Sequence, residues 1–208
     1  MRNKIGFRFL LVTDRKQSPK PLEDLIEKAC KAGLKAVQLR EKDLSSKDLL
    51  RLAKQLRKVT QRYNSKLLIN DRLDIALLSM ADGLHSPENG TPVKCSRQFG
   101  KYLLFGKSVH SLVGALDAEK EGYDYIIFGP VYRTASKTGY VKPKGISGLK
   151  RVCEAVKIPV FAVGGITPER AGSCVKAGAY GTAVISAVMK SSQPKSTISR
   201  FKKAMGEL

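Results

Sequence analysis

The run Gln38-Leu-Arg-Glu-Lys42 places two cations and an amide within five residues, at the end of a short apolar segment. If that segment is a strand, its side chains alternate between two faces, so Gln38, Arg40 and Lys42 point to one side. An arginine can bind two phosphate oxygens and a lysine supplies a point charge, so this row suits a phosphate or a diphosphate. A solvated charged turn is the alternative interpretation.

Two later segments have the composition of a phosphate site. Val163-Gly-Gly-Ile-Thr167 follows one apolar run, and Ile185-Ser-Ala187 follows the next one. Glycines leave backbone N–H groups accessible, and the start of a following helix adds further donors, so both segments predict an anion-binding turn. A glycine turn with a purely structural role is the alternative.

The chain has two histidines, and each of them comes at the end of an apolar run. A neutral imidazole can accept and return a proton near pH 7, which is what general acid–base catalysis requires. We therefore predict that His110 lies in the active site. For His85 we favour the alternative, a histidine that is hydrogen-bonded to its neighbours.

Asn70 and Asp71 also end an apolar run. Magnesium commonly takes one or two carboxylates and leaves its other positions to water and substrate phosphates, so this pair could hold the ion. A cap for the helix that follows is the alternative. By itself the pair does not decide between the two.

A loop between Gly129 and Gly145 is rich in glycine and proline and carries Thr134, Ser136 and Lys137. Two hydroxyls and a lysine in such a loop could close over an anionic substrate. A mobile surface loop is the alternative.

Eight short apolar runs alternate with longer segments of helical periodicity. The predicted strands are Phe7–Val12, Ala36–Leu39, Lys66–Ile69, Gly83–His85, Leu103–Val109, Tyr125–Phe128, Pro159–Val163 and Thr182–Ile185. The predicted helices are Leu22–Ala32, Lys47–Arg62, Leu73–Met80, Leu112–Glu121, Gly148–Val156, Pro168–Ala177 and Thr197–Met205. The segment after His85 contains two prolines and a glycine, which predicts a loop with one turn of helix at most.

Eight strand–helix units in 208 residues predict one domain over residues 1–208, a (β/α)8 barrel of the TIM type. An open, doubly wound sheet is the alternative, but Val12-Thr-Asp-Arg15 lacks the glycine-rich turn of a dinucleotide-binding fold. In a barrel, the carboxyl ends of the strands meet on one face. The barrel therefore predicts that all the residues described above converge.

Composition points to a globular protein outside the membrane. The chain is 42% hydrophobic and 27% charged, and no apolar run approaches the ~20 residues that cross a bilayer. The first apolar stretch is interrupted by Arg8 and has no small-residue cleavage site, so we expect a cytoplasmic protein. Four cysteines without close spacing predict neither a zinc site nor a redox motif.

The formal net charge of +20 keeps polyanions among the candidate partners. The basic residues are spread along the chain, and the aromatic residues do not alternate with them as a base-stacking platform would require. We therefore expect small phosphorylated molecules as partners and no nucleic acid. A homo-oligomer is compatible with the sequence.

The segments LVTD, QLREK, INDRLDIAL, ADGLH, SVHS, DYIIFGPVYRTASK, IPVFAVGGITPE and AGAYGTAVIS follow one another from about residue 10 to about residue 190. Together they resemble the thiamin phosphate synthase family, which also contains the TenI-type thiazole tautomerases. The resemblance implies a synthase that couples an aminopyrimidine methyl diphosphate to a thiazole phosphate and releases pyrophosphate, with the diphosphate leaving first.

The resemblance also implies residue roles, with Arg40 and Lys137 neutralising the leaving group and Asp71 holding Mg²⁺. The implied pyrimidine diphosphate site is Gln38, Leu39, Arg40, Glu41, Lys42, Asn70, Ser108 and Lys137. The implied thiazole phosphate site is Thr134, Ala135, Ser136, Gly164, Gly165, Ile185 and Ser186.

One segment departs from the family pattern. The synthases usually continue ADGxH with LGQxD, whose aspartate is a second magnesium ligand, whereas Gly90 stands at that position here. The tautomerases need no metal, and in them the histidine that matches His110 is the acid–base group. A tautomerase is therefore the alternative function, and a phosphate-sensing or nucleic-acid-binding regulator is a remote one.

Overall fold

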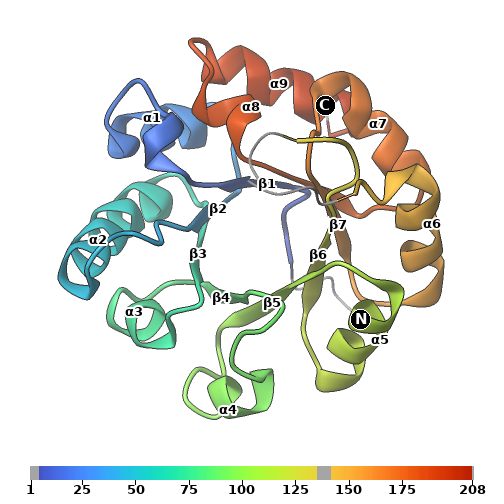
Figure 1. The fold of residues 1–208 in the computed structure, drawn as a ribbon. Helices are drawn as coiled ribbons and strands as arrows, with labels where there is room; N and C mark the ends of the chain where they lie inside the picture. Colours follow the sequence, from blue (N-terminus) through green and yellow to red (C-terminus); the bar gives the residue numbers. More distant parts are fainter. Residues whose placement is uncertain (1–4, 135–141, 208) are drawn as a thin grey trace.

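The computed structural model describes residues 5–134 and 142–207 and shows a closed barrel of eight parallel strands surrounded by helices (Figure 1). The strands are β1 Phe9–Val12, β2 Ala36–Leu39, β3 Lys66–Asn70, β4 Gly83–Ser86, β5 Leu104–Val109, β6 Tyr125–Phe128, β7 Val160–Val163 and β8 Gly181–Val184. They follow one another around the barrel in chain order, and β8 pairs with β1. The predicted (β/α)8 barrel is confirmed.

Eight helices cover the outside of the barrel in the described ranges. They are α1 Leu22–Lys31, α2 Ser46–Arg62, α3 Leu73–Leu78, α4 Val93–Arg97, α5 Leu112–Glu121, α6 Gly145–Ala155, α7 Pro168–Lys176 and α9 Pro194–Ala204. The five residues of α4 confirm the single turn of helix predicted after β4. None of these helices combines the length and apolar character that a bilayer-spanning segment needs.

Two short helices were not predicted from the sequence. A 3-10 helix, η1 Arg15–Gln17, follows β1, and α8 Ser186–Met189 follows β8. With three and four residues, neither is long enough to give a periodic pattern of apolar side chains. Both lie at the carboxyl ends of strands, where the site is found.

The first strand is shorter than predicted because the residues before it close one end of the barrel. Gly6 has a φ of +66°, which ends the extended chain. The Phe7 ring lies 5.4 Å from the Phe161 ring and 6.2 Å from the Tyr125 ring, inside the barrel. Phe7 therefore fills the amino-terminal end of the barrel, and the strand begins at Phe9.

Alternation along each strand builds two separate cores. Leu10 and Val12 belong to the cluster inside the barrel, whereas Phe9 and Leu11 belong to the larger cluster between barrel and helices. Because the strands are covered on both faces, they are apolar throughout in the sequence. At the carboxyl ends of the strands, polar side chains join apolar members of this inner cluster, such as Val12 and Ile127.

Candidate active site

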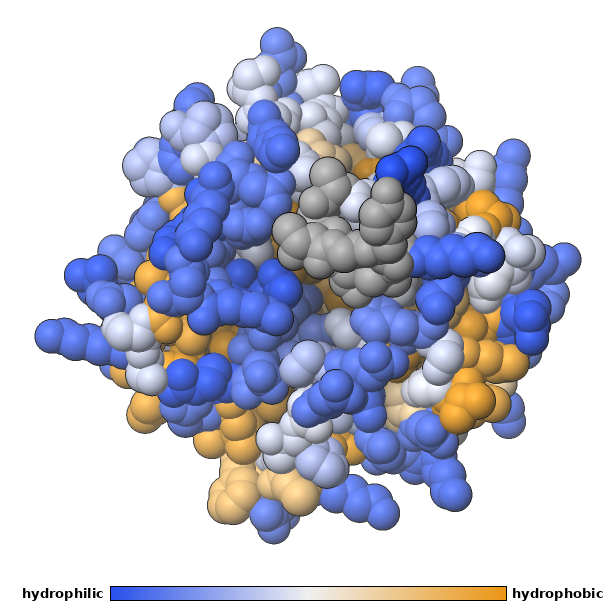
Figure 2. Space-filling model, viewed as in Figure 1, coloured by the Kyte–Doolittle hydropathy of each residue, from blue (hydrophilic) through white to orange (hydrophobic). Residues whose placement is uncertain are grey.

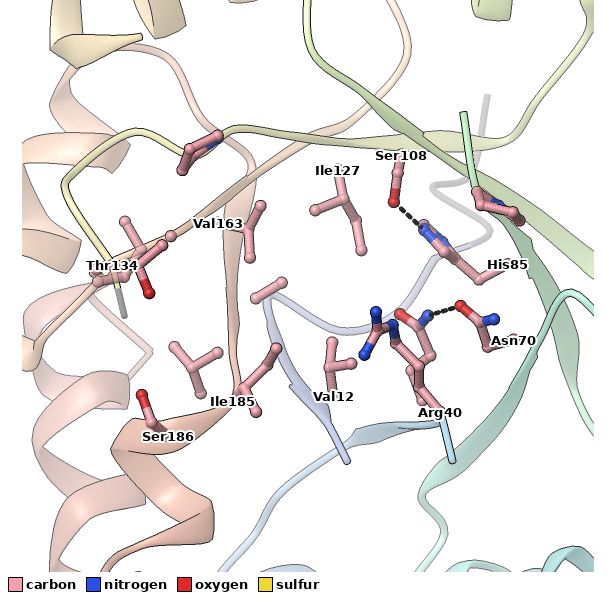
Figure 3. Close-up of a pocket in the computed structure, with 18 of the residues that line it drawn as sticks. Val12, Arg40, Asn70, His85, Ser108, Ile127, Thr134, Val163, Ile185 and Ser186 are labelled. Carbon is pink, nitrogen blue, oxygen red and sulfur yellow. Dashed lines mark hydrogen bonds between the residues drawn. The ribbon is translucent and has the colours of Figure 1, made fainter. Parts of the chain in front are cut away.

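A pocket opens at the carboxyl ends of the strands, and every strand or the loop after it contributes to its lining (Figure 3). Its residues are Val12, Gln38, Arg40, Lys42, Asn70, His85, Pro87, Glu88, Ser108, His110, Ile127, Pro130, Thr134, Val163, Gly164, Gly165, Ile166, Ala183, Val184, Ile185, Ser186 and Ala187. Most of the residues singled out at strand ends in the sequence thus meet in one cavity, as a barrel requires.

The five residues from Gln38 to Lys42, at the end of β2 and just after it, lie in two environments. Gln38, Arg40 and Lys42 line the pocket, in agreement with the expected alternation. Leu39 lies in the core between barrel and helices. The buried Glu41 carboxylate accepts hydrogen bonds from the Arg15 backbone N–H at 3.0 and 3.1 Å. Leu39 and Glu41, which the resemblance includes among the substrate contacts, are not among the pocket-lining residues.

Gln38 and Asn70 form a polar pair on adjacent strands. The Gln38 Nε2 donates to Asn70 Oδ1 at 3.0 Å. The Gln38 Oε1 is buried and has no hydrogen-bond partner among the described residues. A buried oxygen without a donor costs free energy, and the pair therefore presents an unsatisfied acceptor and the Asn70 amide donors.

His85 is buried and held by two hydroxyl groups. Its Nε2 lies 2.9 Å from Ser108 Oγ, and its Nδ1 lies 3.2 Å from the Tyr125 hydroxyl. Burial, and next the positive charge of Arg40, lower the pKa of His85 to about 3. The imidazole is therefore neutral near pH 7, and its contacts position Ser108 at the pocket wall.

His110 lines the same pocket from the end of β5. Its Nδ1 donates a hydrogen bond to the carbonyl oxygen of Gly129. A carbonyl only accepts, so this contact assigns the ring proton of the neutral imidazole to Nδ1. The placement agrees with the predicted position of His110 and does not test its role.

The turn after β7 depends on its two glycines. Gly164 and Gly165 have φ values of +95° and +62°. A Cβ on Gly164 would lie 2.5 Å from the Cβ of Pro130, and one on Gly165 would lie 2.5 Å from the carbonyl oxygen of Arg133. Only glycine fits this backbone against the loop after β6.

The same turn presents a row of backbone donors to the pocket. Three successive carbonyls, those of Val163, Gly164 and Gly165, accept hydrogen bonds from Val131 N, Tyr132 N and Arg170 Nη1 at 2.8, 3.0 and 2.7 Å. In a trans peptide the next N–H points opposite to the carbonyl. The N–H groups of Gly164, Gly165 and Ile166 therefore point away from those partners, and no described residue accepts from them. These residues line the pocket, where such donors suit an anion.

The start of α8 lies beside this turn. Ile185 and Ser186 line the pocket, and Ser186 adds a hydroxyl to its rim (Figure 3). Thr134 lines the pocket from the loop after β6. The predicted contacts Ala135, Ser136 and Lys137 lie outside the described residues.

The donors for a metal ion are sparse. Asp71 is exposed at the end of β3 and its backbone N–H donates to the His85 carbonyl at 2.9 Å, but Asp71 is not among the pocket-lining residues. Glu88 lines the pocket from the loop after β4. Across residues 5–134 and 142–207, no three His, Cys, Asp or Glu side chains gather as a metal site. A magnesium ion would thus need water and substrate oxygens for most of its coordination.

The apolar part of the pocket was not predicted from the sequence. Val12, Ile127 and Val163 line the pocket between the polar groups (Figure 3), and Ala183 lines it as well. Each is the last or last but one residue of a strand. That position was the available signal, because strand ends face the site in a barrel.

Comparisons with known proteins agree with this geometry. The family model described as thiamine monophosphate synthase matches residues 9–188. The thiamine-phosphate synthase of Clostridium novyi (strain NT) is 39% identical over 89% of this chain and 92% of its own. That of Pyrococcus abyssi is 37% identical over 98% and 99%. The solved structure of thiamine phosphate pyrophosphorylase from Pyrococcus furiosus superimposes with a TM-score of 0.88 at 34% identity, covering 96% of each chain. The chain belongs to the thiamine monophosphate synthase family.

Proposed function

We propose that this protein is a thiamin phosphate synthase, a transferase that joins an aminopyrimidine methyl diphosphate to a thiazole phosphate and releases pyrophosphate. The observation that carries the proposal is one pocket with two groups of anion-binding residues. Arg40 and Lys42 lie on the β2 side, and the N–H groups of the Gly164–Ile166 turn lie on the β7 side. The relatives named thiamine-phosphate synthase support the same activity.

The apolar residues between the two anion-binding groups suit two flat rings. In Figure 3, Arg40 and Asn70 lie on one side of the pocket, Thr134 and Ser186 lie on the other, and Val12 lies between them. Two substrates that each carry a ring and a phosphate group could therefore meet ring to ring, with their charged ends apart. Holding two reactants in this way is a large part of a bimolecular enzyme's rate enhancement.

The Gln38–Asn70 pair accounts for pyrimidine recognition in this proposal. An aminopyrimidine presents an exocyclic N–H donor next to a ring nitrogen acceptor. The unsatisfied Gln38 Oε1 would accept from the amine, and the Asn70 amide would donate to the ring nitrogen. A site built on such a pair rejects rings that lack the amine, because the buried oxygen then stays unsatisfied.

The chemistry needs charge stabilisation and no proton transfer. The bond between the methyl carbon and the diphosphate oxygen breaks, and both electrons leave with the pyrophosphate. The thiazole nitrogen then gives its lone pair to the carbon. Arg40 and Lys42 would stabilise the charge that grows on the leaving group, and the apolar wall would keep water from the cation.

The proposal includes Mg²⁺ as cofactor. Asp71 would hold the ion together with water and diphosphate oxygens, since the Asp71 carboxylate has no hydrogen bond or ion pair within the described ranges. When bound, the ion would neutralise part of the diphosphate charge. Gly90 supplies no second carboxylate, so we expect magnesium to bind weakly before the substrate does.

The test is formation of thiamin phosphate from the two substrates, with and without magnesium, by the wild-type protein and Arg40→Ala. We expect magnesium-dependent product from the wild type and a rate at least about a hundredfold lower from the variant, since one preorganised charge contact contributes about 10² or more. No product from a protein that binds thiazole phosphate would contradict the proposal. Proton exchange at the thiazole that is lost in His110→Ala would then support the tautomerase.

A further inference from the structure

Arg170 lies on the first turn of α7 and does not line the pocket, yet it joins the two loops that form one side of it. Its Nη1 donates to the Gly165 carbonyl at 2.7 Å. Its guanidinium carbon lies 4.6 Å from the centre of the Tyr132 ring, in the loop after β6. One planar group thus contacts both the turn after β7 and the loop after β6.

Arg170 does not pair with a carboxylate among the described residues, although one is adjacent. Glu169, the preceding residue, pairs with Arg200 of α9 instead. Arg170 is exposed, and a cation–π contact in water contributes little to stability. A role in global stability therefore explains little of this arrangement, and the two contacts point to a local role at the turn.

The contact with Gly165 determines the direction of a donor. The N–H of Ile166 belongs to the same peptide group as the Gly165 carbonyl, so it points away from Arg170. Gly165, which precedes this peptide and has a φ of +62°, has no side chain to oppose its rotation. If the peptide turned over, a carbonyl oxygen would replace the N–H and would repel an anion.

We propose that Arg170 is a positioning residue for the phosphate-binding turn. It holds the Gly165 carbonyl outward and thereby keeps the Ile166 N–H directed at a phosphate monoester. The Tyr132 ring holds the guanidinium in the orientation that this contact needs. The inference rests on the proposed function in one respect, that the turn after β7 takes the phosphate of the thiazole substrate.

The test compares Arg170→Ala, Arg170→Lys and Arg200→Ala with the wild type. Arg200 is the matched control because it is also exposed and lies in contact with α7 through Glu169, but not with the turn. We would measure the Kd of thiazole phosphate by calorimetry and of inorganic phosphate by ³¹P NMR. The KM of each substrate, kcat and Tm would be measured on the same proteins.

For Arg170→Ala we expect both Kd values and the KM for thiazole phosphate to rise about tenfold, which equals about 1.4 kcal/mol. The KM for the pyrimidine diphosphate and the kcat at saturation should stay within twofold of wild type, and Arg200→Ala should match wild type. Arg170→Lys keeps the charge but loses the planar group, so binding should remain at least about threefold weaker.

Full recovery in Arg170→Lys would show that charge alone matters and would overturn the proposal. Equal losses for both substrates together with a lower Tm would also overturn it, because they would indicate general damage. If the wild type makes no thiamin phosphate, the proposed function fails, while the Kd of inorganic phosphate still decides whether Arg170 positions the turn.

Discussion

At the residue scale, two equally buried side chains of the pocket, Gln38 and His85, differ in whether their polar atoms have hydrogen-bond partners. Gln38 has one satisfied and one unsatisfied polar atom, so its environment is incomplete without a partner in the pocket. His85 has a partner for each ring nitrogen and is complete. The two residues lie on strands that flank β3, yet we expect Gln38 to bind the substrate directly and His85 to position its neighbours.

Gln38→Ala should raise the KM for the pyrimidine diphosphate by about tenfold to a hundredfold. The reason is the loss of one buried hydrogen bond and of the support it gives to Asn70, a cost of about 1–3 kcal/mol. The KM for thiazole phosphate should not change, because Gln38 belongs to the other side of the pocket. Gln61→Ala, on the exposed face of α2, is the control, and equal kinetics of the two variants would contradict the assignment.

His85→Asn should flatten the pH dependence of stability. The pKa of His85 is lowered to about 3 in the folded protein, so the unfolded chain binds the proton more readily. The stability that neutral His85 contributes is complete above about pH 6.5 and is lost as pH falls toward 3, at up to about 1.4 kcal/mol per pH unit. Urea unfolding at pH 4.5, 5.5 and 6.5 measures this. Identical slopes for wild type and variant would be inconsistent with a neutral, buried His85.

At the element scale, much of the architecture could be predicted because short, continuous apolar runs differ clearly from the longer segments of helical periodicity. All eight strands were predicted in order, and Gln38, Arg40 and Lys42 face the pocket as alternation required. Contacts between loops could not be predicted. The hydrogen bonds that hold the Glu41 carboxylate come from Arg15, and the row of donors after β7 depends on partners in the loop after β6. Neither contact can be predicted from the sequence pattern of one segment, because its partners are distant in the chain.

Gly165→Ala should damage the turn after β7 more than the rest of the barrel. The alanine Cβ would lie 2.5 Å from the Arg133 carbonyl oxygen, and the alanine backbone would have to adopt a φ of +62°. We expect the KM for thiazole phosphate to rise at least about tenfold, with a loss of about 1–3 kcal/mol in the free energy of unfolding. Gly122→Ala is the control, because Gly122 also has a positive φ but has open space around it. Comparable kinetic losses in both variants would argue against a phosphate site at Gly165.

At the scale of the whole molecule, the net charge of +20 acts beyond the individual contacts. Figure 2 shows a largely hydrophilic face around the barrel mouth, with hydrophobic side chains at its lower edge near α3 and α4. A positive field of this extent attracts anionic substrates and is screened by salt, with a Debye length of about 10 Å at 0.1 M.

Raising the salt concentration should therefore lower kcat/KM, and more steeply for the diphosphate than for the monophosphate substrate. Between about 0.05 and 0.5 M salt we expect a fall of about five- to tenfold for the diphosphate. Steady-state kinetics at constant magnesium measure it. A kcat/KM that does not change with salt would show that the net charge does not contribute to catalysis. Tight, salt-sensitive binding of duplex DNA without turnover would favour a nucleic-acid-binding regulator.

The central claim is that one pocket holds two anions at once, one near Arg40 and one at the turn after β7. Calorimetric titration of thiazole phosphate into the protein saturated with magnesium pyrophosphate tests it most directly. The account predicts that thiazole phosphate binds one to one, with an affinity equal to or higher than in the absence of pyrophosphate. Competition, in which pyrophosphate abolishes thiazole phosphate binding, would show a single anion site and contradict the account.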